Sequence, residues 1–433
     1  MALFPQEALN DGVRKREVFG WAMYDFANSG YTTVVLTAVF NSYFVGVAAD
    51  GASWATLAWT LVIAASSAIV MLTMPAIGAH ADLHARKKGL LAMSTAACVL
   101  ATVALSGVGR GDLWLAVAAM VVSNVCYSYG ESLTAAFLPE LAREDAIGRV
   151  SGWGWSFGYL GGMLSLGLCL AYVLSAQARG IPATEFVPVT MLITAGVYGV
   201  ASLATFVLLR ERATPRAAAP GGGGGLAEAL RQLATTVRRA RELRDFSWLL
   251  ASGTCYQAGI SVVIALAAVY AEQVLGFKQA QTMMLVFLVN IAAALGAFAF
   301  GYWQDRIGHK PALALTLVGW IVMTLMAWLA TGQALFWAAA VVAGLCMGSS
   351  QSAGRAMVGS FAPAAQRAEF FGLWTFATRL SAIVGPVTYG LVTWWTGGNH
   401  RLAILSTALF FAVGLLLLWP LDAARGRAAA RAA

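Results

Sequence analysis

Long apolar runs alternate with short polar segments along the whole chain. A run of about 20 apolar residues is long enough to cross the hydrocarbon core of a bilayer as a helix. We predict such spans at residues 18–47, 54–79, 89–108, 113–138, 152–174, 186–209, 246–270, 281–302, 311–330, 333–358, 369–395 and 401–420. The pattern therefore predicts an all-α integral membrane protein with twelve transmembrane helices.

A short motif recurs in the turn after the second apolar run of each half. The first copy consists of Gly78, Asp82, Arg86, Lys87 and Lys88, and the second of Gly301, Asp305, Arg306, Gly308, His309 and Lys310. A second landmark, residues 137–139, recurs at nearly the same offset as residues 361–363. Because internal repeats of whole helical bundles are typical of secondary transporters, we predict two pseudo-symmetric six-helix bundles, residues 1–209 and 245–433.

The two bundles are joined by a polar linker at residues 210–244. Its glycine run, residues 221–225, lacks the Lys-Ser or Lys-Thr that follows the glycines of a phosphate-binding loop, which argues against nucleotide binding. Residues 226–243 carry several arginines and predict an amphipathic helix on the anionic inner leaflet.

Composition and charge agree with a membrane protein and indicate its orientation. Hydrophobic residues make up 59% of the chain and charged residues 11%, whereas soluble domains have roughly 25% charged residues. If the N-terminus is inside, 22 of the 28 Lys and Arg lie on the cytoplasmic side, where short loops retain basic residues. We therefore expect cytoplasmic termini in the inner (plasma) membrane, and attribute the net charge of +8 to topology and not to nucleic-acid binding.

The twelve spans, the linker and the repeated Gly-x-x-x-Asp turns together resemble the major facilitator superfamily over essentially the whole chain. The second turn matches the superfamily signature at its key positions, whereas the first lacks the Arg and the internal Gly. In the superfamily the turn aspartate bridges to neighbouring helix ends when the protein is open to the outside. The resemblance thus implies a conformational latch at Gly78, Asp82, Arg86, Gly301, Asp305, Arg306 and Lys310. The alternative is a turn that only fixes topology.

A narrower resemblance rests on five segments, residues 20–30, 137–140, 150–152, 158–162 and 369–372, of which Tyr-Asp-Phe-Ala-Asn-Ser in the first is the most specific. These segments are similar to the bacterial facilitators related to the fungal vacuolar effluxers of autophagy. What this family implies is export of small solutes, which are amino acids in the fungal relatives.

Four charged residues lie inside predicted spans and away from the span ends. A charge at mid-membrane costs roughly 2.5–3.5 kcal/mol on insertion scales and normally faces a polar cavity or a partner. Two carboxylates and two guanidiniums at similar depth can neutralise one another. Together with polar neighbours at helical spacing, they form the candidate substrate-binding or coupling site: Asp25, Asn28, Asn124, Tyr127, Glu131, Tyr256, Gln257, Gln351, Arg355 and Arg379.

Two roles for these charges stay open. In one, Asp25 or Glu131 takes up a proton when substrate draws its arginine partner away, and an arginine holds a substrate carboxylate. In the other, the charges form a permanently paired network that closes the cytoplasmic gate.

We interpret Trp153, Trp155 and Trp374 as interfacial anchors, with stacking on substrate as the alternative.

These features predict a monomeric secondary active transporter that moves a small solute by alternating access, coupled to protons. Besides the solute and protons, the expected partner is the lipid bilayer. We expect no enzyme activity, because the sequence shows no paired-His zinc motif and no histidine inside a predicted span. No cofactor and no metal ion are expected. The alternative function is a lipid or lysolipid flippase on the same fold.

Overall fold

The computed structural model describes residues 4–52, 54–213, 243–277 and 279–432. Within these residues twelve helical spans are long and apolar enough to cross a membrane. The predicted all-α membrane fold is therefore confirmed. The amphipathic helix predicted in the linker falls on residues outside the described ranges.

Each half contributes six of the long spans. The spans of the first bundle are α1 (Lys15–Tyr31) with its continuation to Ala48, α3 (Ala55–His84), α4 (Lys87–Leu105), α5 (Leu113–Ala135), α7 (Ile147–Ala178) and α8 (Ala183–Leu208). Those of the second are α10 (Arg244–Leu275), α11 (Gln279–Ile307), α12 (His309–Leu329), α13 (Gln333–Phe361), α14 (Arg367–Trp395) and α15 (His400–Leu418). Short helices are η1 (Gln6–Ala8), α6 (Leu138–Leu141), η4 (Glu144–Ala146) and α16 (Ala423–Ala432).

The first span is not the single regular helix that its apolar run predicts. After α1 the chain forms a π-helix, η2 (Thr32–Ala38), then α2 (Phe40–Tyr43) and a second π-helix, η3 (Phe44–Ala48). The Thr32 and Thr33 hydroxyls both donate to the carbonyl of Ser29, at 3.0 and 2.9 Å. Threonine hydroxyls that bond to earlier carbonyls, next to β-branched neighbours, disturb regular α-helical bonding.

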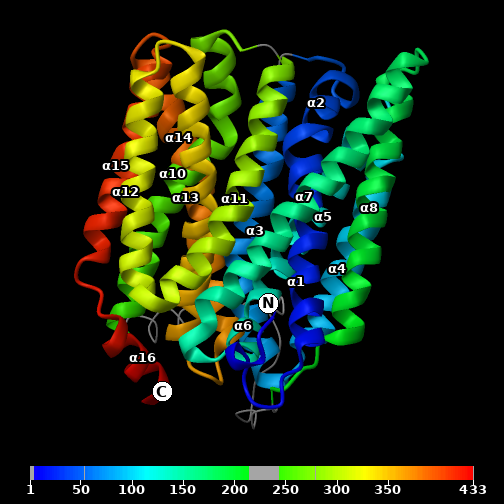
Figure 1. The fold of residues 1–433 in the computed structure, drawn as a ribbon. Helices are drawn as coiled ribbons and strands as arrows, with labels where there is room; N and C mark the ends of the chain where they lie inside the picture. The colour runs from blue at the N-terminus through cyan, green and yellow to red at the C-terminus, as the bar shows by residue number, and fades with distance from the viewer. Residues whose placement is uncertain (1–3, 53, 214–242, 278, 433) are drawn as a thin grey trace.

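The two bundles lie side by side, and both chain termini lie at one end of the molecule (Figure 1). We call this the terminal end and the opposite one the far end. Across the interface α3 packs on α14 and α7 packs on α11. A Cβ atom on Gly78 would collide with the Ala368 carbonyl, and one on Gly152 with the Ala297 carbonyl. Glycine at these positions lets the bundles meet backbone to backbone.

The helix α16 also joins the bundles at the terminal end. Arg425 donates two hydrogen bonds, each 2.7 Å long, to the buried carboxylate of Asp245 in the second bundle. Arg427 and Arg431 pair with Glu144 of the first bundle. The last helix is therefore fixed firmly to its own bundle and more loosely to the other.

Candidate functional site

A cavity of about 770 Å³ lies between the bundles and takes its walls from both. Its lining begins near the far end, at Asn41 and Trp59. Toward the chain termini it reaches α1, α5, α13 and α14, where Glu131 and Arg355 lie four and six residues before the ends of α5 and α13. The charged side chains among the described lining residues are Asp25, Glu131, Arg355 and Arg379. All four charges predicted inside spans therefore face one cavity, and they form its inner end.

The first ion pair at the inner end, Asp25 with Arg355, is deeply buried. The guanidinium donates to the Asp25 carboxylate at 2.6 Å, and to the hydroxyl and the carbonyl of Ser151 at 3.1 and 2.7 Å. Its carbon lies 4.8 Å from the ring centroid of Trp21 and 5.2 Å from that of Trp155. The side chains of Arg355 and Asp25 are only 8% and 12% exposed. Every charged group in this cluster thus has close partners.

The second ion pair, Glu131 with Arg379, is open to the cavity. One hydrogen bond of 3.3 Å joins them, and the Arg379 guanidinium lies 5.9 Å from the Tyr127 ring centroid. The Glu131 side chain is 40% exposed and the Arg379 side chain 17%. This pair has fewer contacts to lose, and a solute in the cavity can reach both partners.

The remaining predicted site residues divide into two groups. Asn28, Gln257 and Gln351 line the cavity, and the two glutamine amides are hydrogen-bonded to each other at 2.8 Å. Asn124 and Tyr256 are buried and are not part of the described lining. A helical stripe read from sequence is wide enough to include residues that face the interior of one bundle. Tyr256 is such a residue, since its side chain packs against Gly354 and Trp374 of its own bundle.

The structure places the tryptophans differently from the interfacial positions that we expected. Trp155 and Trp374 lie in the cavity wall. Trp153 is buried, and its indole N–H donates to the Tyr302 hydroxyl at 3.2 Å. Trp21 contacts Arg355, and its role was not evident from sequence. One sequence feature could have predicted that this face of α7 contacts α1. Gly154 and Gly158, on either side of Trp155, allow the two helices to approach closely.

The latch aspartate of the second half binds the start of α7. The Asp305 carboxylate accepts hydrogen bonds from the backbone N–H groups of Gly148 and Arg149, at 2.9 and 3.0 Å, and from the Arg149 side chain at 3.0 Å. The first N–H groups of a helix lack partners within the helix and carry a partial positive charge. Asp305 therefore joins the second bundle to the first by three hydrogen bonds.

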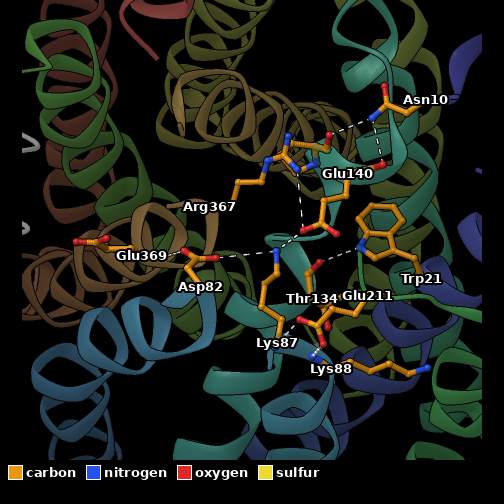
Figure 2. A network of polar contacts seen from close by, with 11 residues as sticks. Asn10, Trp21, Asp82, Lys87, Lys88, Thr134, Glu140, Glu211, Arg367 and Glu369 are labelled. Carbon is orange, nitrogen blue, oxygen red and sulfur yellow. Dashed lines mark hydrogen bonds and ion pairs between the residues drawn. The ribbon is translucent and has the colours of Figure 1, made fainter. Parts of the chain in front are cut away.

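The latch aspartate of the first half binds α14 in the same manner but within a larger network (Figure 2). Asp82 accepts from the backbone N–H of Glu369 at 3.0 Å, and its other oxygen lies 3.9 Å from the ammonium of Lys87. Lys87 is fully buried and also pairs with Glu140, which lies 4.0 Å from Arg367. Four charges of alternating sign thus connect the two bundles here.

The other predicted latch residues contribute unequally. Gly301 packs directly against the backbone at the start of α7. Lys310 donates to carbonyls after α15, including that of Leu421 at 2.6 Å. Arg86 and Arg306 are exposed. In the first turn the buried Lys87, and not Arg86, lies beside the aspartate.

The beginning of the linker is attached to the first latch. The Glu211 carboxylate accepts from the backbone N–H groups of Lys87 and Lys88 at 2.7 and 3.1 Å, so it caps the start of α4. Burial raises the pKa of Glu211 above its ordinary value, although these two N–H groups and the charge of Lys87 act in the opposite direction. Arg212 pairs with the buried Glu17 at 2.8 Å.

The two six-helix bundles, the cavity between them and the contacts of Asp82 and Asp305 with helix ends of the opposite bundle are those of a transporter of the major facilitator superfamily, a multi-pass membrane protein. Similar solved structures include the human organic anion transporter MFSD10, with 16% identity, a TM-score of 0.74 and coverage of 93% of this chain and 99% of that chain. They also include the superfamily transporter FucP in the outward conformation, with 14% identity, a TM-score of 0.67 and coverage of 94% and 97%. At these identities the likeness shows the fold.

The family model described as "Vacuole effluxer Atg22 like" matches residues 41–431, and the chain belongs to this family. The uncharacterized MFS-type transporter YxiO of Bacillus subtilis is 25% identical over 92% of this chain and 93% of its own length. Autophagy-related protein 22-1 of Penicillium rubens is 25% identical over 64% of this chain and 50% of its own length. The chain thus spans about half the length of the fungal relatives that it matches.

Proposed function

We propose that this chain is a proton-coupled exporter of a small zwitterionic solute, and that Glu131 and Arg379 are the residues at which proton and solute exchange. The observation that carries this proposal is the open ion pair at the inner end of the cavity. A carboxylate that is 40% exposed and joined to its arginine by one hydrogen bond of 3.3 Å can lose that partner to a competing solute. The alternative of a permanently paired gate fits the buried pair, Asp25 with Arg355, better.

The orientation of the chain indicates which side of the membrane the cavity faces in the described conformation. The distribution of Lys and Arg favours a cytoplasmic terminal end. The Asp305 and Asp82 contacts join the bundles at that end, while the cavity lining continues to Asn41 and Trp59 near the far end. In this orientation, the cavity of the described conformation opens toward the outside of the plasma membrane.

The charge balance of the cavity supports a zwitterionic solute. Two carboxylates and two guanidiniums among the described lining residues sum to zero formal charge. A zwitterionic solute can form a bidentate contact between its carboxylate and Arg379, and can pair its ammonium group with the ionised Glu131. Protonation of Glu131 removes the partner of the ammonium group and weakens solute binding. Proton and solute therefore compete for Glu131, as exchange requires. The family description as an effluxer is consistent with export.

Transport in proteoliposomes tests this proposal. We expect Glu131→Gln to abolish pH-gradient-driven accumulation of radiolabelled neutral amino acids while it preserves exchange across the membrane, because exchange needs no net proton movement. Full pH-driven accumulation by Glu131→Gln would refute the proton role.

The same liposomes, loaded with a fluorescent lysolipid, test the flippase alternative. Lysolipid translocation without amino-acid transport would favour that alternative.

Labelling tests the proposed orientation. A cysteine introduced at Ala432 in the C-terminal helix should react only with thiol reagents that reach the cytoplasm. Reaction with an impermeant reagent added to intact cells would reverse the orientation and, with it, the direction of export.

A further inference from the structure

Arg355 belongs to the second bundle, yet its guanidinium is enclosed by groups of the first. These are the Asp25 carboxylate, the Ser151 hydroxyl and carbonyl, and the ring faces of Trp21 and Trp155. We call these four residues the ammonium box. They lie on α1 and α7, and none of them is cationic.

The chemistry of the ammonium box is that of a receptor for an organic cation. It offers a carboxylate, two neutral hydrogen-bond acceptors and two aromatic faces, and a cation over desolvated aromatic rings is stabilised by their quadrupoles. Gly154 completes the space, because a Cβ atom there would contact Arg355, Asp25 and Trp21. Any residue larger than glycine would therefore intrude on the occupant.

The ammonium box is rigid within its own bundle. The Trp21 indole N–H donates to the Thr134 carbonyl of α5 at 2.8 Å (Figure 2). A Cβ atom on Gly161 would collide with the Phe26 backbone, so α1 and α7 are in close contact here. Alternating access is largely rigid-body rocking of one bundle against the other. The box should therefore move as one unit, while Arg355 moves with the opposite bundle.

We propose that Arg355 is a built-in competitor for a substrate ammonium group, which enters the ammonium box when the terminal end opens. This inference rests on the proposed function and deepens it, because it assigns the site that the solute's ammonium group occupies while the terminal end is open. Separation of the bundles withdraws the guanidinium and leaves Asp25 without a counter-ion. An ammonium group from the cytoplasm restores the charge balance. When the terminal end closes, Arg355 returns and displaces the ammonium group toward the far end, which favours export.

Chemical occupation of the empty box tests the proposal on purified protein. We expect ethylguanidinium and ethylammonium, compared with sodium chloride at equal ionic strength, to raise the thermal unfolding midpoint of Arg355→Ala in a saturable manner. In wild-type protein the same rise should need at least about tenfold more probe, because the guanidinium already occupies the box. Arg355→Gln is measured in parallel, so that misfolding of one variant does not decide the result.

Two further variants define the site. In the Arg355→Ala background, Asp25→Asn should eliminate the rise, and Trp155→Leu should weaken the apparent affinity roughly 2- to 30-fold. Absence of a saturable rise in both Arg355→Ala and Arg355→Gln, or a rise that persists with Asp25→Asn, would overturn the proposal. Because Glu131 lies outside the box, these outcomes are independent of whether Glu131→Gln loses pH-driven accumulation.

Discussion

The Asp25–Arg355 and Glu131–Arg379 pairs both cross the interface between the bundles, but they differ in how they are held. Arg355 has three hydrogen-bond acceptors and two aromatic neighbours, whereas Glu131 and Arg379 share one hydrogen bond and remain accessible from the cavity. Two ion pairs at similar depth can therefore have different roles. A buried pair resists separation until whole bundles move, and an exposed pair can respond to a solute.

The largest expected difference is in stability. Asp25→Asn leaves a buried guanidinium without its counter-ion, which should cost about 3–5 kcal/mol of unfolding free energy. Glu131→Gln at the exposed pair should cost about 1 kcal/mol or less. Thermal unfolding of the two variants in the same detergent measures the contrast. Equal midpoints would show that burial does not distinguish the two pairs.

The two latch aspartates extend the comparison to the terminal end. Asp305→Asn weakens three hydrogen bonds at the start of α7, whereas Asp82→Asn leaves Lys87 paired with Glu140. We expect Asp305→Asn to slow transport roughly 10- to 100-fold with little change in substrate binding, and Asp82→Asn to slow it less.

Transport rates and equilibrium binding, measured on the same proteoliposome preparations, test this order. Arg306→Gln is the matched control, because Arg306 is exposed in the same turn. If both aspartate variants transport at the wild-type rate, the turns only fix topology.

The smallest expected effect concerns the exposed contacts of α16. Glu144→Gln removes the pairing with Arg427 and Arg431, and exposed pairs contribute about 1 kcal/mol or less. The effect on transport rate should be at most a few-fold and should disappear at high salt, where surface charges are screened. Arg425→Gln, which removes two hydrogen bonds from a buried carboxylate, should have a larger, salt-resistant effect.

The architecture could be predicted from sequence because lipid imposes a simple rule: apolar runs of sufficient length become spanning helices. The irregular continuation of α1 could not, since it depends on how Thr32 and Thr33 bond within an otherwise apolar run. Sequence also identified the four membrane charges, because each is costly without a partner. It could not pair them, because the choice of partner depends on how the two bundles pack.

The aromatic contacts of Arg355 show the same limit. Trp155 lies near the end of its predicted span, a position typical of interfacial tryptophan. Only the packing of α7 on α1 turns its ring toward the interior, where it contacts a guanidinium that is distant in sequence. Contacts between bundles are therefore the part of the site that single-helix patterns do not contain.

The balance of two positive and two negative side chains in the cavity has an electrical consequence. Under the proposed function each zwitterion leaves in exchange for one proton. A zwitterion carries no net charge, so such a cycle moves one positive charge inward. Transport would then be electrogenic, and an inside-negative potential would add about 2.3 kcal/mol per 100 mV to the driving force. That energy corresponds to roughly a 50-fold solute gradient. A cell could therefore expel the solute even when the pH is equal on both sides of its membrane.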